Sequence, residues 1–342
     1  MRRILPAFGL ALLSPLVAEF LLGDFPLTSL HFLVLLAPTY GGAALLIREV
    51  ARRAGIGWPG IVLMSLAYGV FEEGIMTMSL FNPDYAGQRL LDPGFVPALG
   101  IGVPWTLFVL ALHTVWSMSV PIALTEELTG ARRTTPWLGK IGLTVTAVLA
   151  VLGAALTTVF SYMNGHFLAS VPQLVSIVVI VVALVALAFR LPRRVSADQL
   201  PHRADADQPP RQTGTDRAAE APAPWLVLVV TLVAGMLFEA PNVLLGDQVG
   251  LGIALLAGVE VGMTALALFW SARRGWDGRH RMALAGGALL TYVWHAFFSG
   301  PVVPATPLIN LVSHLVFGLG ALVLLAFAAR RVAANADVPQ SR

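Results

Sequence analysis

The sequence predicts an all-α fold, a polytopic bundle of about ten transmembrane helices. Its 342 residues are 57% hydrophobic and only 12% charged, against about 25% charged in an ordinary soluble domain. The apolar residues stand in runs of about 20, the helix length that crosses a bilayer core of roughly 30 Å. The basic residues fall almost entirely between alternate pairs of these runs, which is typical of cytoplasmic loops.

The composition also excludes whole classes of function. A soluble globule of this size could not bury so much apolar surface, so the lipid bilayer is the expected partner and a nucleic acid is not. The pI near 9.7 accompanies a net charge of only +3. The chain has no cysteine, which excludes disulfides, iron–sulfur clusters and thiolate metal sites. Any metal would be held by histidine, carboxylate, amide or backbone ligands.

Ten stretches qualify as membrane spans by length and hydropathy. We place them at 4–23, 30–50, 59–81, 103–125, 139–162, 171–191, 224–246, 250–271, 282–299 and 304–329. With these spans, 21 of the 22 Lys and Arg residues lie on one side of the membrane and only Arg89 lies on the other. By the positive-inside rule we expect both termini in the cytoplasm, with the protein in the inner (plasma) membrane of the cell.

Residues 192–223 interrupt the pattern of spans. They are rich in Pro, Asp, Arg, Gln and Ala, a composition that cannot build a core, so they predict a disordered cytoplasmic linker. The linker divides the chain into an N-terminal bundle of six spans at 1–191 and a C-terminal bundle of four spans at 224–330. A cytoplasmic tail follows at 331–342.

Short matches on the two sides of the linker indicate a parallel duplication of spans 1–4 and 7–10. The letters LLGD end the first span at 21–24 and the seventh at 244–247. The letters ARR follow the second span at 51–53 and the eighth at 272–274. Chance similarity between apolar segments of low complexity is the alternative, and the sequence leaves both open.

Several ionisable side chains lie inside the predicted spans. Such a group costs about 2.5 kcal/mol or more at a helix centre, so it usually faces the bundle interior and serves a function. At 1.5 Å rise per residue, all of them fall in one slab from mid-membrane into the outer half. They are Glu72, Glu73, His113, Glu239, Glu260, His295 and His314. Glu19 lies nearer the outer edge.

Glu72 and Glu73 are the most informative pair in this slab. Adjacent helical residues point about 100° apart, so we expect one carboxylate to line a cavity and the other to meet a neighbouring helix. Two carboxylates at this depth require a cation or strong hydrogen-bond donors. In the next span, His113 and Trp116 share a predicted helix face. Pro121 is expected to kink that span and free a backbone carbonyl.

Polar groups near the outer ends of the spans predict a path for a substrate or an ion. Pro241 breaks the seventh span, and broken helices at membrane depth often expose backbone groups to a bound ion. We assign to this path Glu239, Glu260, His314, His166, Asn164 and Asn242. For 162–166, an ordinary helix end explains the sequence equally well.

The charged residues on the cytoplasmic side are expected to form solvated or interfacial ion pairs. Arg48 and Glu49 are one such pair, and Glu126 and Glu127 lie shortly before further arginines. The sequence contains no Walker, GxSxG, HExxH or GxGxxG motif, which disfavours ATPases, α/β-hydrolases, zincins and dinucleotide-binding enzymes.

The run AYGVFEEG at 67–74, followed by His113 one span later and by another intramembrane histidine, resembles the CPBP family of intramembrane metal-dependent proteases. These are bacterial relatives of the CAAX-processing endopeptidase. The family carries a glutamate pair with an arginine four residues on, a histidine in the next span, and a histidine with Asn or Asp four residues on. Glu72 and Glu73 match the pair.

The other elements match less closely. His113 fits the second element with Phe108 five residues before it instead of four, and Thr77 stands in the arginine position. The third element is either His166, with Ser170 in the last place, or His295. The resemblance covers residues 60–170, about a third of the chain.

The resemblance implies peptide hydrolysis within the bilayer, on a membrane-protein or peptide substrate. It implies catalytic roles for Glu72, Glu73 and His113, and a divalent metal such as zinc on Glu73, His113 and His295. The chemistry is consistent, because a metal lowers the pKa of bound water and a carboxylate can act as general base.

Two other functions fit the same residues. A proton- or cation-coupled secondary transporter would use ten spans, broken helices and buried Glu and His side chains. A non-catalytic membrane scaffold would need these groups only for stability. The sequence therefore leaves open whether the protein is an enzyme.

Overall fold

A computed structural model describes residues 4–191, 220–241 and 248–336 of the chain. Most of the predicted linker, together with Asn242, lies outside the described residues. Where the linker ends, the backbone N–H of Ala221 donates to the carbonyl of Arg274 at 2.8 Å. The predicted all-α fold is confirmed in the described residues, because nearly every long apolar run is helical.

The first four predicted spans are built from short helical pieces joined end to end. In chain order these are α1 (Leu5–Pro15), the π-helix η1 (Leu16–Leu21), the 3₁₀-helix η2 (Leu27–Phe32), α2 (Leu33–Leu36), the π-helix η3 (Ala37–Gly41), α3 (Gly42–Arg53), α4 (Trp58–Phe71), the π-helix η4 (Glu72–Met76), α5 (Val103–Leu112), the π-helix η5 (His113–Ser119) and α6 (Val120–Thr129). The 3₁₀-helix η6 (Gly130–Arg132) follows α6.

The remaining helices are longer and more regular. They are α7 (Lys140–Gly165), α8 (Val171–Arg190), α9 (Pro224–Ala240), α10 (Val249–Ser271), α11 (Gly278–His295) and α12 (Pro307–Ala336). Helix α12 continues past the predicted end of the last span into the predicted tail.

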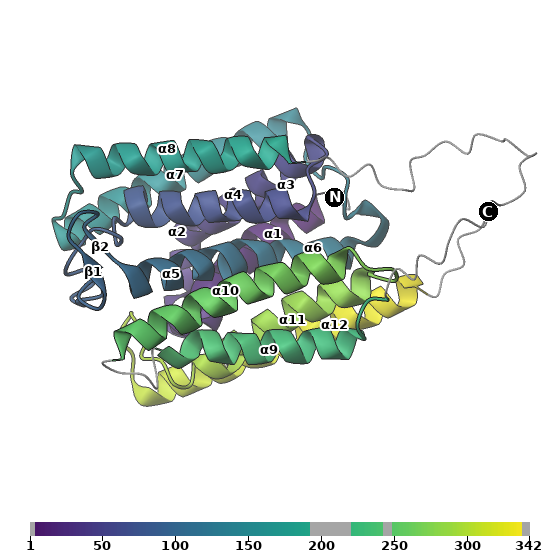
Figure 1. Cartoon of the computed structure of the whole chain (residues 1–342). Coiled ribbons are helices and arrows are strands. Elements are labelled where there is room, and N and C mark those ends of the chain that lie inside the picture. Colours follow the sequence, from purple (N-terminus) through teal and green to yellow (C-terminus); the bar gives the residue numbers. More distant parts are fainter. Residues whose placement is uncertain (1–3, 192–219, 242–247, 337–342) are drawn as a thin grey trace, which may run out of the picture.

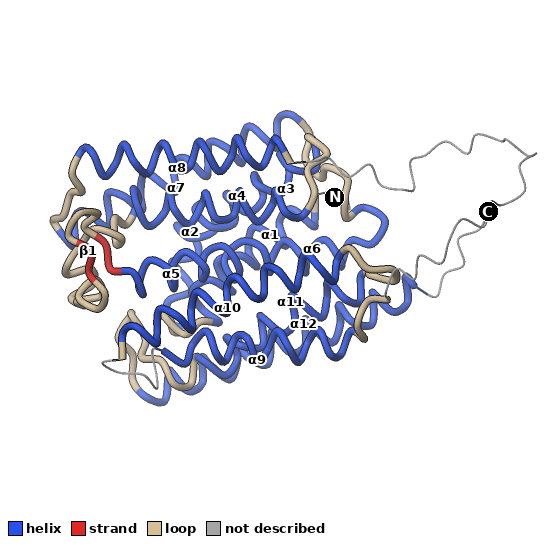
Figure 2. The backbone as a smooth tube through the Cα atoms, viewed as in Figure 1, coloured by secondary structure: helices blue, strands red, loops and turns tan. Residues whose placement is uncertain are grey.

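The helices lie side by side along a common direction (Figures 1 and 2). At one end of the bundle, the loop before α5 forms a small antiparallel hairpin of β1 (Phe95–Val96) and β2 (Ile101–Gly102), with Phe95 opposite Gly102. At the other end, Arg331 of α12 donates to the carbonyl of Leu128 at 2.9 Å. The last helix thus ends beside the α6–α7 connection.

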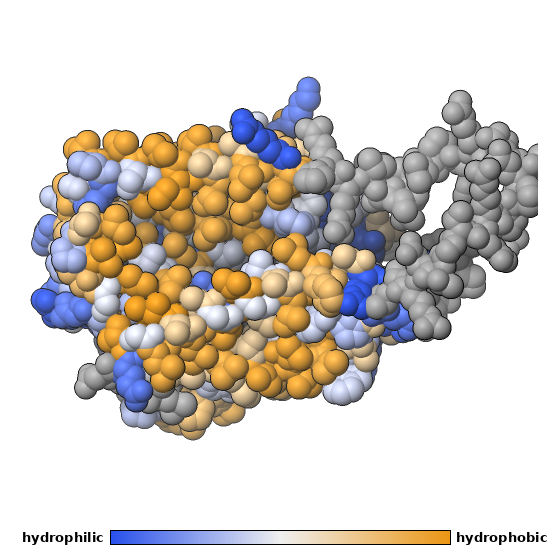
Figure 3. Space-filling model, viewed as in Figure 1, coloured by the Kyte–Doolittle hydropathy of each residue, from blue (hydrophilic) through white to orange (hydrophobic). Residues whose placement is uncertain are grey.

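The outside of the bundle suits a bilayer. On the face shown in Figure 3, apolar side chains cover most of the middle of the molecule and hydrophilic ones gather toward its two ends. Among the described residues, six helices are long and apolar enough to cross a membrane. They are Leu27–Arg53, Val103–Arg132, Lys140–Gly165, Val171–Arg190, Val249–Ser271 and Pro307–Ala334.

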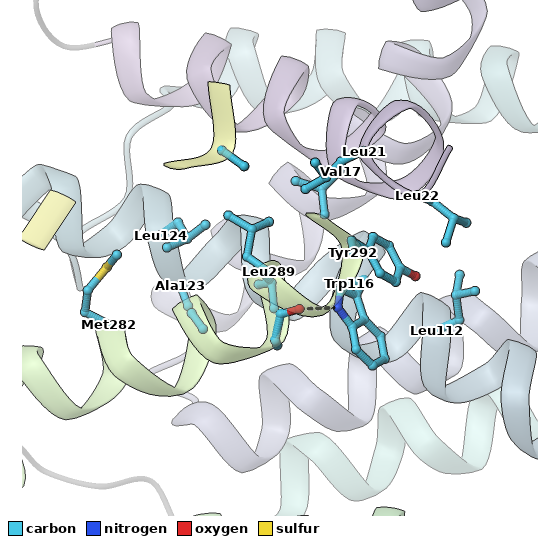
Figure 4. Packing of buried hydrophobic residues seen from close by; sticks show 14 of the residues in the cluster. Val17, Leu21, Leu22, Leu112, Trp116, Ala123, Leu124, Met282, Leu289 and Tyr292 are labelled. Atoms are coloured by element: carbon cyan, nitrogen blue, oxygen red, sulfur yellow. Dashed lines mark hydrogen bonds between the residues drawn. The ribbon is translucent and has the colours of Figure 1, made fainter. Parts of the chain in front are cut away.

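The N-terminal and C-terminal helices share one hydrophobic core. Leu112 and Trp116 pack in the same cluster as Phe238, Leu289 and Tyr292 (Figure 4). Helix α6 lies between the two groups, because it contacts α1 on one side and α11 and α12 on the other. The predicted six-span and four-span bundles are therefore not separated by packing.

The packing partners differ between the predicted repeats. Helix α9 packs closely on α11, because Gly287 lets the two backbones approach: a Cβ there would lie 2.6 Å from the carbonyl oxygen of Leu228. Helix α1 instead packs mainly on η3, α6 and α3. These differences do not favour the duplication, which stays a prediction.

The ion pairs of Arg48 with Glu49 and Glu126 are buried, so the expectation that they are solvated is wrong. The Arg48 guanidinium is fully buried, 2.6 Å from Glu49 and 3.1 Å from Glu126. It also donates to the carbonyl of Thr135 at 2.7 Å and stacks 3.5 Å from the centre of the Trp137 ring. The α6–α7 connection folds over this arginine and removes the pairs from water.

Candidate metal centre

Polar side chains of the candidate centre lie on four π-helical segments. Segment η1 carries Glu19, η3 carries Tyr40, η4 carries Glu72 and Glu73, and η5 carries His113. π-Helical turns are rare and occur frequently at functional sites, where the wider turn displaces side chains from their α-helical positions. Each of the first four predicted spans contributes one such segment.

A proline accounts for an open backbone group in η5. Pro121 has no N–H, so the carbonyl of Ser117, four residues earlier, lacks its α-helical donor. The hydroxyl of Ser14 in α1 donates to this carbonyl at 2.6 Å. The freed carbonyl predicted from Pro121 is thus confirmed, and it ties η5 to α1.

A second proline accounts for a close approach between α1 and η3. Pro15 leaves the carbonyl of Ala11 without its α-helical donor. The backbone of Gly41 lies so close that a Cβ atom there would be 2.0 Å from the Ala11 oxygen. Only glycine fits, and this contact positions η3 and therefore Tyr40.

The two glutamates bind opposite nitrogens of one imidazole. His113 Nδ1 lies 3.1 Å from Glu72 Oε2, and His113 Nε2 lies 2.7 Å from Glu73 Oε1. All three residues are at most 5% exposed. The expected divergence of Glu72 and Glu73 is wrong, because the π turn of η4 and the length of the side chains bring both carboxylates to the histidine.

Hydroxyl groups orient one of the two carboxylates. Thr77 Oγ1 donates to Glu73 Oε2 at 3.0 Å, and the Ser79 hydroxyl donates to the same oxygen. Trp105 Nε1 in turn donates to Ser79 Oγ at 3.2 Å. Thr77, which stands in the arginine position of the CPBP pattern, therefore contacts the second glutamate of the pair.

Tyr40 forms one wall of the centre. Its ring stacks on His113 with 6.0 Å between centroids and 17° between planes. Its hydroxyl interacts with the carboxylates of Glu19 and Glu72. The Tyr68 ring meets Tyr40 edge-on at 6.2 Å.

The donor set fits a divalent cation. One ligand atom from each of Glu72, Glu73 and His113 lies within 4.8 Å of the other two. Of these atoms, Glu72 Oε2 lies on the Nδ1 side of the imidazole, 3.1 Å from that nitrogen. Imidazole and carboxylate groups are both ligands of zinc and similar metals, and three protein ligands would leave one coordination position for water or substrate.

The structure does not bring His295 to this centre. His295 lies on α11, where its Nδ1 is 3.2 Å from Glu239 Oε2 of α9. Within the described residues, the group that fits a metal contains Glu72 in place of the expected His295.

Trp116 does not face the same partners as His113, although the sequence predicts one shared helix face for the two residues. It points to α11, where it stacks on Tyr292 and donates to the Ala288 carbonyl at 2.7 Å (Figure 4).

The other predicted path residues are scattered. Glu260 is half-buried on α10, and His314 on α12 meets Phe297 edge-on. Asn164 and His166 are exposed at the end of α7, where Asn164 donates to the Phe160 carbonyl. For Asn164 and His166, an ordinary helix end therefore explains the sequence better than a path for a substrate or an ion.

Sequence reasoning did not find Tyr40 and Ser79. Both side chains are neutral, so neither stands out in an apolar span as a charged residue does. A short Pro-Thr-Tyr-Gly-Gly stretch at 38–42 was the available signal, because proline and glycine inside an apolar span mark an irregular helix turn.

A family model matches residues 8–338, nearly the whole chain, and is described as an uncharacterized membrane protein family. The chain belongs to this family. It is therefore a helical membrane protein, in agreement with the apolar helices and their exterior. Neither a curated protein nor a solved structure matches the chain significantly.

Proposed function

We propose that the protein is a metal-dependent hydrolase that works inside the membrane, with peptide bonds of membrane proteins as its substrate. The observation that carries the proposal is the meeting of Glu72, Glu73 and His113 in one buried group that fits a divalent metal such as zinc. The resemblance to the CPBP family supports the reaction type on the same three residues. The family's second histidine has no counterpart in this group among the described residues.

The roles of the side chains follow from their surroundings. Glu73 is held by Thr77 and Ser79, as a ligand with a fixed orientation requires. Glu72 lies beside the other nitrogen of His113, and we assign to it the transfer of a proton from water to the leaving group. A bound divalent metal would polarise the scissile carbonyl and make that water more acidic.

Metal content is the decisive measurement. Mass spectrometry of the purified full chain should find about one tightly bound divalent metal per protein, and His113→Ala should lose it. His295→Ala is the matched control, because it removes a buried histidine outside the group and should keep the metal. An unloaded wild-type protein after growth with zinc, or an unchanged metal content in His113→Ala, would refute the proposal. Retained proteolysis in a Glu72→Gln, Glu73→Gln double variant would also count against it.

A cation-coupled transporter is the second candidate. It is favoured by the second buried carboxylate–imidazole pair, Glu239 and His295, because transporters commonly carry such groups along an ion path. In liposomes, substrate-dependent proton or cation flux should fall in Glu239→Gln. Flux that is unaffected by replacing Glu72, Glu73, Glu239 and Glu260 would reject transport, and a purely structural scaffold would show neither flux nor hydrolysis.

We also propose ten membrane spans with both termini in the cytoplasm of a bacterial inner membrane. The distribution of the basic residues supports this topology. Because the chain has no cysteine, single cysteines can be introduced without background. An impermeant maleimide should label Asp92→Cys in intact cells and Arg274→Cys only after permeabilisation. The reverse pattern would invert the topology.

A further inference from the structure

Two further carboxylates, Glu19 and Asp24, interact with the metal centre without belonging to it. Glu19 lies on η1 and interacts electrostatically with His113 and Glu73. Asp24 follows the end of η1, and its electrostatic partners are Glu19 and His113. The backbone N–H of Asp24 donates to the Glu19 carbonyl at 3.0 Å, so both residues belong to one turn. No lysine or arginine of the described residues neutralises either carboxylate.

The hydroxyl of Tyr292 on α11 approaches the same region from the C-terminal helices. Tyr292 is fully buried, and its hydroxyl makes no hydrogen bond within the described residues. It interacts electrostatically with Asp24 and Glu19. In Figure 4 the hydroxyl points to the side where Leu22 and Leu112 lie, and these precede Asp24 and His113 closely in the chain. A buried hydroxyl without a partner is costly, so its position indicates a ligand.

Glu19 and Asp24 are also the accessible carboxylates of this region. Both are half-buried, whereas the three residues of the metal centre are buried. Tyr85, in the loop between η4 and β1, is half-buried too and interacts electrostatically with Glu19 and Asp24. The part of this region that a molecule from outside can touch is therefore acidic.

The occupant that fits these groups is a positive organic group and not a metal ion. Metal ligands have to converge on one point, and Glu19 and Asp24 are not part of the described group whose ligand atoms lie within 4.8 Å of one another. A guanidinium spreads five N–H donors over a planar fork, so it can reach acceptors that lie farther apart. Its charge would be balanced by the carboxylates, and the phenol oxygen of Tyr292 can accept a further N–H.

We propose that Glu19, Asp24 and Tyr292 bind a basic side chain of the peptide substrate, arginine above all, next to the metal centre. The inference rests on the proposed function for the cleavage step, and it names the specificity of that step: the scissile bond lies close to a basic residue. The binding step requires no cleavage and can be measured by itself.

The affinities of two pentapeptides test this site. The full chain in detergent is titrated with acetyl-Ala-Ala-Arg-Ala-Ala-amide and with the same peptide carrying citrulline, which resembles arginine in shape but has no charge. The arginine peptide should bind saturably and about tenfold more tightly, as a charge-assisted contact predicts. The double variant Glu19→Gln, Asp24→Asn should abolish this preference. Asp84→Asn is the control, because Asp84 is an exposed carboxylate in the loop that carries Tyr85.

Tyr292→Phe separates recognition from folding. The substitution removes a hydroxyl that makes no hydrogen bond within the described residues and keeps the ring that stacks on Trp116. It should weaken binding of the arginine peptide about threefold and leave the unfolding midpoint unchanged. A hydroxyl that served only the fold would instead lower the midpoint and leave binding unaffected.

This inference and the proposed function fail in different ways. Equal affinity for the two peptides, or no saturable binding of the arginine peptide, would overturn the inference. A preference that survives both the double variant and Tyr292→Phe would overturn it as well. His113→Ala should lose the metal and keep the preference for arginine. A wild-type protein without metal would refute the hydrolase and leave the difference between the two peptides intact.

Discussion

Glu126 and Glu127 are adjacent on α6, yet their carboxylates join opposite parts of the bundle. Glu126 accepts from Arg48 at 3.1 Å and from Arg52 at 2.5 Å, both on α3. Glu127 accepts from Arg281 on α11 at 2.5 Å. Helix α6 therefore connects the N-terminal helices to the C-terminal ones through two successive residues near its C-terminal end.

The burial of these two ion pairs predicts unequal effects of their removal. Glu126→Gln leaves Arg48 buried with one carboxylate fewer, and losing one partner of a buried pair costs about 3–5 kcal/mol in the free energy of unfolding. Arg281 is 19% exposed, so water can replace its partner and Glu127→Gln should cost about 1 kcal/mol or less. Thermal unfolding of the detergent-solubilised variants checks this. Equal losses, or a larger loss for Glu127→Gln, would contradict it.

The hydroxyls around Glu73 predict an indirect effect on metal binding. Ser79→Ala removes a donor that orients the carboxylate, and outer-shell partners of this kind typically change metal affinity by about 10–100-fold. The measurement is a metal titration with a competing chelator. Ser65→Ala is the control, because Ser65 is equally buried and donates within its own helix to the Ile61 carbonyl. A Ser79→Ala protein with wild-type affinity would remove Ser79 from the centre.

The sequence predicts the depth of the charged groups in the membrane but not the direction in which they point. Counting residues from the span ends placed Glu73, His113 and His295 at similar depth, and depth follows from helix rise alone. Direction around the helix axis depends on packing and on π turns. His295 faces Glu239 because α11 packs on α9, and no residue count contains that information.

The charges around Arg48 illustrate the same limit. Arg48 stands near the end of the apolar span predicted at 30–50 and looks like a residue at the membrane surface. Its burial depends on the α6–α7 connection, some 85 residues later, where the carbonyls of Arg133 and Thr135 accept from it. A contact across that distance in the chain is set by the tertiary fold, so local sequence patterns cannot reveal it.

The contacts of Trp116 predict that the packing of η5 on α11 contributes to the free energy of unfolding. Trp116→Phe removes the donor to the Ala288 carbonyl and part of a buried ring that stacks on Tyr292. Leaving a buried polar group unsatisfied costs about 1–3 kcal/mol in the free energy of unfolding. Thermal unfolding should show a clear loss for Trp116→Phe. Trp225→Phe is the control, because Trp225 is 68% exposed and should change stability little. Similar midpoints for the two variants would show that the Ala288 contact contributes nothing.

Two adjacent glycines on α11 make the sharpest test of the helix packing. A Cβ on Gly287 would lie 2.6 Å from the carbonyl oxygen of Leu228 in α9, and backbone cannot move aside as a flexible side chain can. Overpacking of this kind costs about 1–3 kcal/mol, more than the gain of about 1 kcal/mol in helix propensity from replacing glycine by alanine.

At Gly286, a Cβ would meet Leu325 at 3.4 Å, an ordinary contact with a movable side chain. Gly287→Ala should therefore lower the unfolding midpoint, whereas Gly286→Ala should leave it unchanged or raise it. The two variants share composition, helix and depth, so the difference between them isolates the contact with α9. If both glycines tolerate alanine equally, α9 and α11 do not pack as closely as this arrangement requires, and the position of Glu239 beside His295 would have to be revised with them.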